Sequence, residues 1–265
     1  MNIFIHELKA YRRSTLIWTA SLSLLAVLYL SIFPAFYKDA RILTDVFAAF
    51  PQMVRDALGI SPDMIASILG FYSFLIGYMV LCGAIQAMNI GISLLSKEAA
   101  GKTVDFLLTK PVTRARILTF KLLAALVCIV VTNLVYLVVA SLMAWSVQEK
   151  QFDYKLYLML SLSLFYVQLI FMALGFLASV LLRKIKSVLP ITLSTVFGFY
   201  FISLFSSAIK DAQLRVLTPF RYFDPIYILN NSAYELSYVL ISILIVIICI
   251  AATYLIYQNK DIHAG

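Results

Sequence analysis

Residues 97–121 read KEAAGKTVDFLLTKPVTRARILTFK and lie between two long apolar segments. The stretch carries six of the chain's 21 Lys and Arg residues, although only 13% of the chain is charged. It is amphipathic, and it is too polar to lie in the hydrocarbon of a bilayer. A polar insert between two apolar segments of span length indicates that the chain crosses a membrane on either side of it.

The composition of the whole chain supports this interpretation. Its 265 residues are 63% hydrophobic with a mean hydropathy of +0.95, whereas soluble domains are about 45–50% apolar. The net charge of +8 then fits basic loops on the cytoplasmic face of a bilayer, and we expect no nucleic acid as a partner. Cys82, Cys128 and Cys249 lie in separate apolar runs, and His6 and His263 lie at opposite ends. We therefore expect neither a disulfide nor a metal site.

Six apolar segments are long enough to cross the bilayer, which predicts an all-α membrane protein with a single transmembrane domain over residues 1–265. Residues 1–15 alternate apolar and basic positions and are predicted to form a helix in the membrane interface. The fourth span contains a small-residue patch where another helix can approach closely, formed by Ala173, Gly175, Ala178 and Ser179. The spans are expected at about residues 16–36, 64–96, 117–145, 155–182, 188–208 and 234–257.

Six spans place both termini on the same side of the membrane. Of the 21 Lys and Arg residues, 13 lie on the side of the termini, which also includes the second-to-third and fourth-to-fifth connections. Only 8 lie in the other three connections. The positive-inside rule therefore places the N-terminus, the C-terminus and residues 97–121 in the cytoplasm of a multi-pass membrane protein.

Gly101, Lys102 and Thr103 match only the end of a nucleotide-binding P-loop. The full motif is G-x-x-x-x-G-K-[ST] after a buried strand, but its first position here is Ser96 and a long helix precedes it. The centres of the spans hold no Asp, Glu, Lys or Arg, which ion-driven carriers usually keep there. The chain is therefore predicted not to be an enzyme and to bind no cofactor. If ATP drives it, the ATPase is another polypeptide.

Uncharged polar side chains mark a candidate site inside the membrane. Gln86, Asn89 and Ser93 form one stripe on the second span, and Asn133 and Gln168 lie within the third and fourth spans. Such groups either line a transport pathway or hydrogen-bond neighbouring helices. The sequence leaves both interpretations open.

The insert itself also allows two interpretations from its chemistry. Its apolar residues between Val104 and Leu108 form a patch that fits the groove of a partner, and Pro111 turns the chain after it. In that case a short helix at residues 97–112 transmits movement between two rigid spans. The alternative is an ordinary basic loop that serves only membrane topology.

The pattern E-x-x-G-K-T-V-D-F-L-L-T-K-P-V-T-R-A-R-I-L-T-F-K resembles the cytoplasmic signature of type-2 ABC transporter permeases, the ABC-2 family. Lys102 between Gly101 and Thr103 is a small departure from it. The segments ELKAYRRSTLIW, FPQMVRDALGI, PFRYFDP and YQNKDI also resemble features of this family, so the resemblance covers the chain in order. The matching signature positions are Glu98, Gly101, Thr103, Asp105, Leu107, Leu108, Pro111, Arg114 and Lys121.

This resemblance implies a function that the residues alone do not. ABC-2 permeases dimerise, and each docks a separate ATPase subunit that holds ATP and Mg²⁺. Residues 97–112 would be the coupling helix, with the ATPase contacted by Glu98, Gly101, Thr103, Asp105, Phe106, Leu107, Leu108 and Pro111.

We therefore expect the permease subunit of an ABC exporter in a bacterial cell membrane. It would be paired with an identical or sister permease and surrounded by lipid, and its substrate would be hydrophobic or amphipathic. A stand-alone channel, or an immunity or scaffold protein without an ATPase, is the alternative.

Overall fold

The structure is a computed structural model that describes residues 3–38, 45–46, 49–58, 67–101, 113–182, 185–209 and 211–259. The described part of the chain is helical and contains no strand. Six of its helices are long and apolar enough to cross a membrane. This confirms the predicted all-α membrane fold with six spans.

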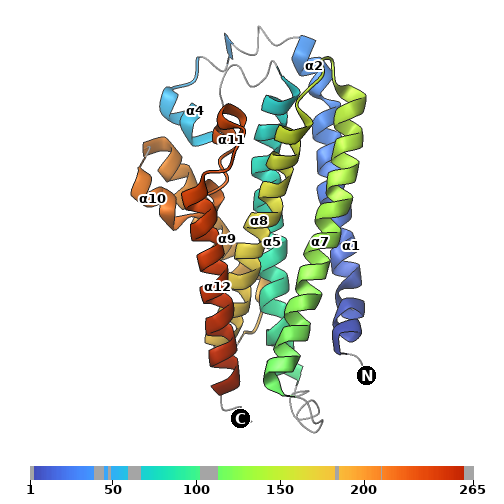
Figure 1. The fold of residues 1–265 in the computed structure, drawn as a ribbon, viewed down its shortest axis with the longest axis vertical. Coiled ribbons are helices and arrows are strands. Elements are labelled where there is room, and N and C mark those ends of the chain that lie inside the picture. Colours follow the sequence, from blue (N-terminus) through green and yellow to red (C-terminus); the bar gives the residue numbers. More distant parts are fainter. Residues whose placement is uncertain are drawn as a thin grey trace.

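The helices that cross the membrane lie side by side, and the short elements gather at one end of the bundle (Figure 1). We call this end the upper end, and we call the end where the chain begins and the last helix finishes the lower end. The long helices are α1 (Ile3–Ser31), α5 (Ile68–Gly101), α7 (Arg114–Val147), α8 (Tyr154–Leu181), α9 (Val188–Ile209) and α12 (Leu236–Asn259). The short elements are α2 (Phe33–Lys38), α4 (Gln52–Leu58), α10 (Ala212–Leu217), the 3-10 helix η2 (Pro219–Arg221) and α11 (Pro225–Asn231).

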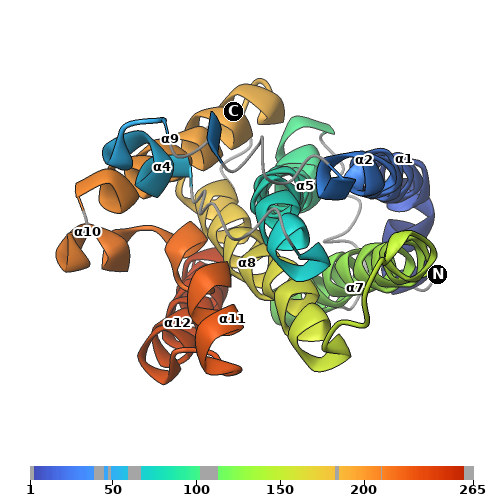
Figure 2. The same cartoon turned by 90° about the horizontal axis from the view of Figure 1, so that it is seen from above.

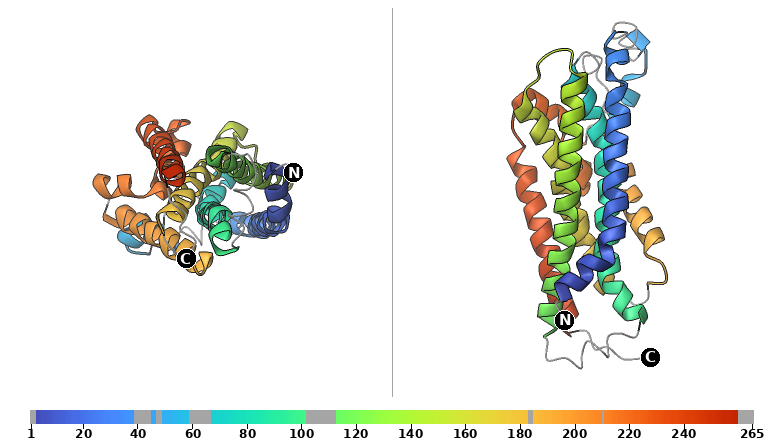
Figure 3. Two further views of the ribbon diagram at one scale, coloured as in Figure 1. Left: turned by 90° about the horizontal axis from the view of Figure 1, so that it is seen from below. Right: turned by 90° about the vertical axis from the view of Figure 1, so that its right-hand side faces the viewer.

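The basic N-terminal segment and the first span share one helix. α1 continues from Ile3 to Ser31 without interruption, although the sequence divides it into an interfacial segment and a span. The right-hand view in Figure 3 shows that its first turns are inclined to the rest of the helix. Lys9, Arg12 and Arg13 in these turns are exposed, which suits the level of lipid headgroups.

Helices α5 and α7 are longer than the core of a bilayer. Each contains 34 residues, which corresponds to roughly 50 Å of helix, whereas the hydrocarbon core is about 30 Å thick. Both helices therefore extend beyond the core. α5 ends and α7 begins at the lower end (Figure 1), so the described residues on both sides of the insert lie there.

Two helix pairs form the centre of the bundle. α5 packs along α8 and α1 packs along α7, and these are the most extensive contacts among the described elements (Figure 2). α12 lies against α8, and α9 lies against α5. The outer faces of α1, α7, α9 and α12 carry exposed Leu, Ile, Val and Phe side chains, which suit a lipid environment.

The backbones of α5 and α8 touch where the two helices cross. A Cβ atom on Gly91 would lie 2.5 Å from the carbonyl oxygen of Met172, and one on Gly175 would lie 2.7 Å from that of Met88. Only glycine fits such an approach. The predicted close contact at the small-residue patch is therefore confirmed at Gly175, with α5 as the partner helix.

Candidate functional site

Most of the predicted ATPase-coupling residues lie outside the part of the chain that the structure describes. The backbone of Glu98 and Gly101 belongs to the last turns of α5. α7 then begins at Arg114, where the side chain of Thr113 accepts a hydrogen bond from the Arg116 amide and caps the helix. The residues outside the described part of the chain are Thr103, Asp105, Phe106, Leu107, Leu108 and Pro111.

The first turns of α7 are attached to the end of α12. Arg114 Nη1 donates to the carbonyl oxygen of Gln258 at 3.2 Å, and the hydroxyls of Thr119 and Tyr254 are 2.7 Å apart. These contacts join the third and sixth spans at the lower end. A displacement of the start of α7 would therefore act on α12 as well.

The predicted polar stripe forms hydrogen bonds between helices. Gln86 Nε2 donates to Thr132 Oγ1 at 2.9 Å, and Gln168 Nε2 donates to Gln86 Oε1 at 3.1 Å. Asn133 Nδ2 donates to Gln168 Oε1 at 2.5 Å. One chain of donors and acceptors thus runs through α7, α8 and α5 and returns to α7.

Two further residues of the stripe lie on the same helix α5. Ser93 is buried and accepts a hydrogen bond from the Tyr11 hydroxyl of α1 at 2.8 Å, while Asn89 is half-buried. Four of the five predicted polar residues therefore form the interhelical bonds that the sequence left as one of two interpretations. Their role in lining a pathway stays a prediction.

Sequence reasoning missed the hydroxyl groups that complete this network. Thr132 bonds Gln86 and lies 3.0 Å from the hydroxyl of Thr19 on α1. In the upper half, the hydroxyl of Tyr72 on α5 lies 3.0 Å from that of Tyr136 on α7 and 2.8 Å from that of Ser161 on α8. Threonine and tyrosine are common in apolar helices, so their presence in a span does not identify them as members of a hydrogen-bond network. Only their spatial arrangement identifies them.

A cavity of about 130 Å³ lies near the upper end between α5, α8, α9 and the segment that follows α10. Its wall combines hydroxyl groups with aromatic rings, and Gly77 leaves open space where a side chain would project. A mixed wall of this kind can contact both the polar and the apolar part of a small amphipathic molecule. The lining includes Ser73, Phe74, Tyr78, Ser163, Tyr200, Ser203, Ser207 and Phe220.

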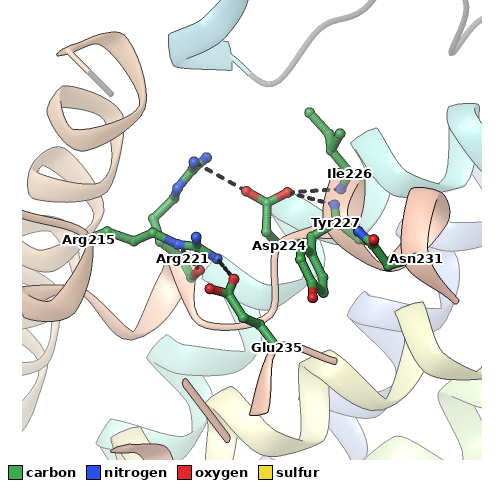
Figure 4. Close-up of polar contacts among 7 residues, drawn as sticks. All are labelled: Arg215, Arg221, Asp224, Ile226, Tyr227, Asn231 and Glu235. Atoms are coloured by element: carbon green, nitrogen blue, oxygen red, sulfur yellow. Dashed lines mark hydrogen bonds and ion pairs between the residues drawn. The ribbon is translucent and has the colours of Figure 1, made fainter. Parts of the chain in front are cut away.

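An ion pair stands at one side of this cavity. Arg221 and Asp224 both line it, and Arg221 Nη2 lies 3.2 Å from Asp224 Oδ2 (Figure 4). The other carboxylate oxygen of Asp224 accepts the backbone amides of Ile226 and Tyr227 and caps α11. Asp224 therefore holds the cavity-side arginine and the start of α11 together.

A second ion pair fixes the short elements above the cavity. Arg215 Nη2 of α10 lies 2.7 Å from Glu235 Oε2, and Arg215 Nε donates to the Arg221 carbonyl oxygen at 3.2 Å (Figure 4). The guanidinium also stacks over the Tyr238 ring, 4.1 Å from its centre. One arginine thus ties α10, η2 and the start of α12 into a single cap, which we call the upper cap (residues 211–238).

The hydroxyl of Tyr222 supports the upper cap from inside. Burial, with a smaller contribution from Tyr238, raises the pKa of Tyr222 to about 12. The hydroxyl therefore keeps its proton at neutral pH and donates it to the carbonyl oxygen of Val216. This bond closes the loop between α10 and η2.

The described residues contain no group of three or more His, Cys, Asp or Glu side chains that could hold a metal ion. Cys82, Cys128 and Cys249 are free thiols on different helices. The chemistry available in the described part of the chain is hydrogen bonding, ion pairing and apolar contact, which suits binding and movement.

A family model described as ABC-2 family transporter protein matches residues 1–262 of the chain. The match includes all six spans, the insert at the lower end and the upper cap. Curated proteins compared with the sequence gave no significant match.

Proposed function

Because the chain belongs to the ABC-2 family of transporter proteins, we propose that it is the permease of an exporter whose ATP is hydrolysed by a separate subunit. Family membership makes it a multi-pass transport component of an ABC transporter that is not itself catalytic. The observation that carries the proposal is the match over residues 1–262 together with six spans. The partner, the direction of transport and the membrane of a bacterial cell belong to the proposal.

The lower end faces the cytoplasm in this proposal, and the ATPase docks on the insert between α5 and α7. The excess of basic residues on the side of both termini supports this orientation. So does the length of α5 and α7, because their extensions lift the insert away from the hydrocarbon core. The docking and coupling surface is then formed by Glu98, Gly101, Thr103, Asp105, Phe106, Leu107, Leu108 and Pro111.

The cargo in this proposal is hydrophobic or amphipathic, and the upper cavity is part of its route. The cavity lies between spans α5, α8 and α9, and its wall contains both serine and aromatic residues. Arg221 and Asp224 add one positive and one negative group at its side. A second permease subunit, identical or a sister chain, completes the route. Movement of the ATPase reaches the cavity through α5, which extends from the insert to the cavity wall.

Affinity purification of the tagged chain from its native membranes tests the proposal. An ATP-binding subunit should co-purify, and its ATP hydrolysis should be faster in the complex than alone. The double substitution Asp105→Ala with Leu108→Ala should lower hydrolysis to the rate of the isolated ATPase, because it removes one charged and one apolar contact of the docking surface. Membrane insertion should stay unchanged.

A matched control removes the same kinds of side chain at the other end of the molecule. Glu149→Ala with Leu236→Ala changes exposed residues of the upper end and should leave the stimulation intact. Recovery of the wild-type chain with no nucleotide-binding subunit would overturn the proposal in favour of a stand-alone channel or scaffold. Full stimulation by the Asp105/Leu108 variant would remove only the coupling role of the insert.

A further inference from the structure

Lys121 is a buried lysine that contacts two other helices at the lower end. Its Nζ lies 2.9 Å from Glu7 Oε1 of α1 and 2.6 Å from the carbonyl oxygen of Leu94 in α5. The side chain is only 2% exposed, and that of Glu7 is 14% exposed. One ammonium group on α7 therefore joins α1, α7 and α5 in a single polar contact, which we call the lysine clasp (Glu7, Leu94 and Lys121).

The geometry of the clasp fixes the position of α5 through its backbone. A carbonyl oxygen has two lone pairs, so Leu94 can accept from the ammonium group and still take part in its helix. Neither apolar contact nor the side chain at position 94 is needed for this link.

A second link lies beside the clasp. The Tyr11 hydroxyl of α1, one turn after Glu7, donates to Ser93 of α5, the neighbour of Leu94. α1 packs mainly on α7 and α5 mainly on α8. The ring contacts between α1 and α5, such as Tyr29 with Phe71, lie at the upper end. Polar contacts therefore connect the α1/α7 pair to the α5/α8 pair at this end.

Stability alone does not explain a buried ion pair at this position. Replacement of such a pair by apolar residues of similar volume is often neutral or stabilising, because taking two charges out of water is costly. What the pair supplies is a defined relative position of the three helices. Lys121 lies less than two turns after the first residue of α7. Leu94 lies one to two turns before the last residue of α5.

We propose that Lys121 is a positioning residue that makes the lower ends of α1, α5 and α7 move as one body. A displacement of the insert by the ATPase then reaches both helix pairs together and does not separate them. This proposal rests on the proposed function, because the insert is the place where the force is applied. The clasp transmits the force, and it does not bind the ATPase or the cargo.

Spin labels on the full chain in lipid nanodiscs test the rigid connection without any partner. With the three native cysteines replaced, labels at Arg116→Cys on α7 and Leu181→Cys on α8 report the distance between the two helix pairs at the lower end; both positions are exposed. The distance distribution should be narrow in the parent and at least twice as wide after Glu7→Gln with Lys121→Met. Lys121→Arg, which retains the donors and the charge, should keep the narrow distribution.

The double substitution is chosen because it leaves no unpaired buried charge, so the variant should insert and assemble normally. Glu149→Gln with Lys155→Met is the matched control, since it removes the same two side chains at exposed positions of the upper end. It should leave the distribution narrow. An unchanged distribution in the Glu7/Lys121 variant would overturn the proposal.

The complex with the co-purifying ATPase supplies the second measurement. The Glu7/Lys121 variant should retain ATPase binding, while permease-stimulated ATP hydrolysis falls at least tenfold, and Lys121→Arg should restore it. Retained stimulation despite a widened distribution would show that the clasp does not transmit force. If no ATPase co-purifies with the wild-type chain, the proposed function fails, and the spin-label distances still decide whether the clasp holds the helices together.

Discussion

Gln86 and Gln168 are fully buried, and each amide both donates and accepts a hydrogen bond between helices. An unpaired amide in an apolar environment loses its hydration without compensation. Measured interhelical hydrogen bonds in membranes nevertheless average only about 0.6 kcal/mol, with a maximum near 1.7 kcal/mol. The two glutamines therefore specify which helices meet more than they stabilise the bundle.

A double-mutant cycle at these positions separates the two effects. Gln86→Leu and Gln168→Leu should each lower the free energy of unfolding by about 1–3 kcal/mol, because the first leaves Gln168 Nε2 without its acceptor and the second leaves Gln86 Oε1 without its donor. The loss of unfolding free energy in the double variant should be smaller than the sum of the two single losses by about 0.5–1.7 kcal/mol, because neither glutamine remains to lose a hydrogen bond. Unfolding of the purified protein in mixed micelles measures all three. Strictly additive costs would contradict a direct bond between the amides.

The residues of this network could be predicted only in part. An amide in an apolar span stands out in the sequence, which is why Gln86, Asn133 and Gln168 were identified as polar members of a site. Their partners did not stand out, because the bonds join residues 35 to 82 positions apart. Lys121 and Glu7 are 114 positions apart, so the sequence gives no signal that the two side chains form an ion pair.

At the scale of helices, Gly77 and Gly91 of α5 differ in how closely other atoms approach them. Gly91 of α5 lies against the backbone of α8, whereas a Cβ atom on Gly77 of the same helix would have no neighbour within 4 Å. A backbone oxygen cannot move aside as a flexible side chain can, so the first site is closed to any larger residue. The second is open because it faces the upper cavity.

Two substitutions in α5 test this difference. Gly91→Ala should lower the free energy of unfolding by about 1–3 kcal/mol, because it forces a methyl group to 2.5 Å from the Met172 carbonyl oxygen. Gly77→Ala should be neutral or stabilise by up to about 1 kcal/mol, because alanine favours the helix more than glycine does. Thermal unfolding in detergent compares both with the wild type. Equal effects at the two positions would show that α5 and α8 do not approach as closely as described.

The sequence predicted the existence of the helices better than their arrangement. Apolar length alone identified six spans, and the small-residue patch at Gly175 indicated one close contact. The pairing of α1 with α7 and of α5 with α8 could not be predicted, because helices that are apolar on all sides lack a periodic face. The continuity of α1 was also hidden, since Lys9, Arg12 and Arg13 alter its polarity without breaking the helix.

At the scale of the molecule, polar contacts connect the two helix pairs at several levels. The lysine clasp lies at the lower end, the glutamine network lies in the middle, and the Tyr72–Tyr136–Ser161 cluster lies nearer the upper end. α5 packs mainly on α8 and α1 mainly on α7, whereas hydrogen bonds such as Gln86 to Thr132 and Tyr72 to Tyr136 join one pair to the other. These contacts therefore hold the two pairs at a defined spacing at three levels of the bundle.

Two ion pairs hold the upper cap together beside the cavity. Such a cap bears on which side of the membrane the upper end faces. Arg215–Glu235 and Arg221–Asp224 hold its short elements together above the cavity, with exposed polar residues such as Gln213 around them. An exporter needs a closure of this kind on the side where cargo leaves. Basic residues gather at the opposite end, where the insert begins. If the chain is an exporter as we propose, both features predict that the upper end lies outside the cell.

Thiol labelling in intact cells tests this orientation. In a chain without the three native cysteines, Gln213→Cys and Glu149→Cys should react with a membrane-impermeant maleimide added outside, because both side chains are exposed at the upper end. Ala10→Cys and Arg116→Cys are also at exposed positions but lie at the lower end, so they should react at least tenfold more slowly until the cells are permeabilised. The reverse pattern would place the insert outside the cell, where no ATP-hydrolysing subunit could reach it. The proposed export mechanism would then fail even though the six-span fold remained correct.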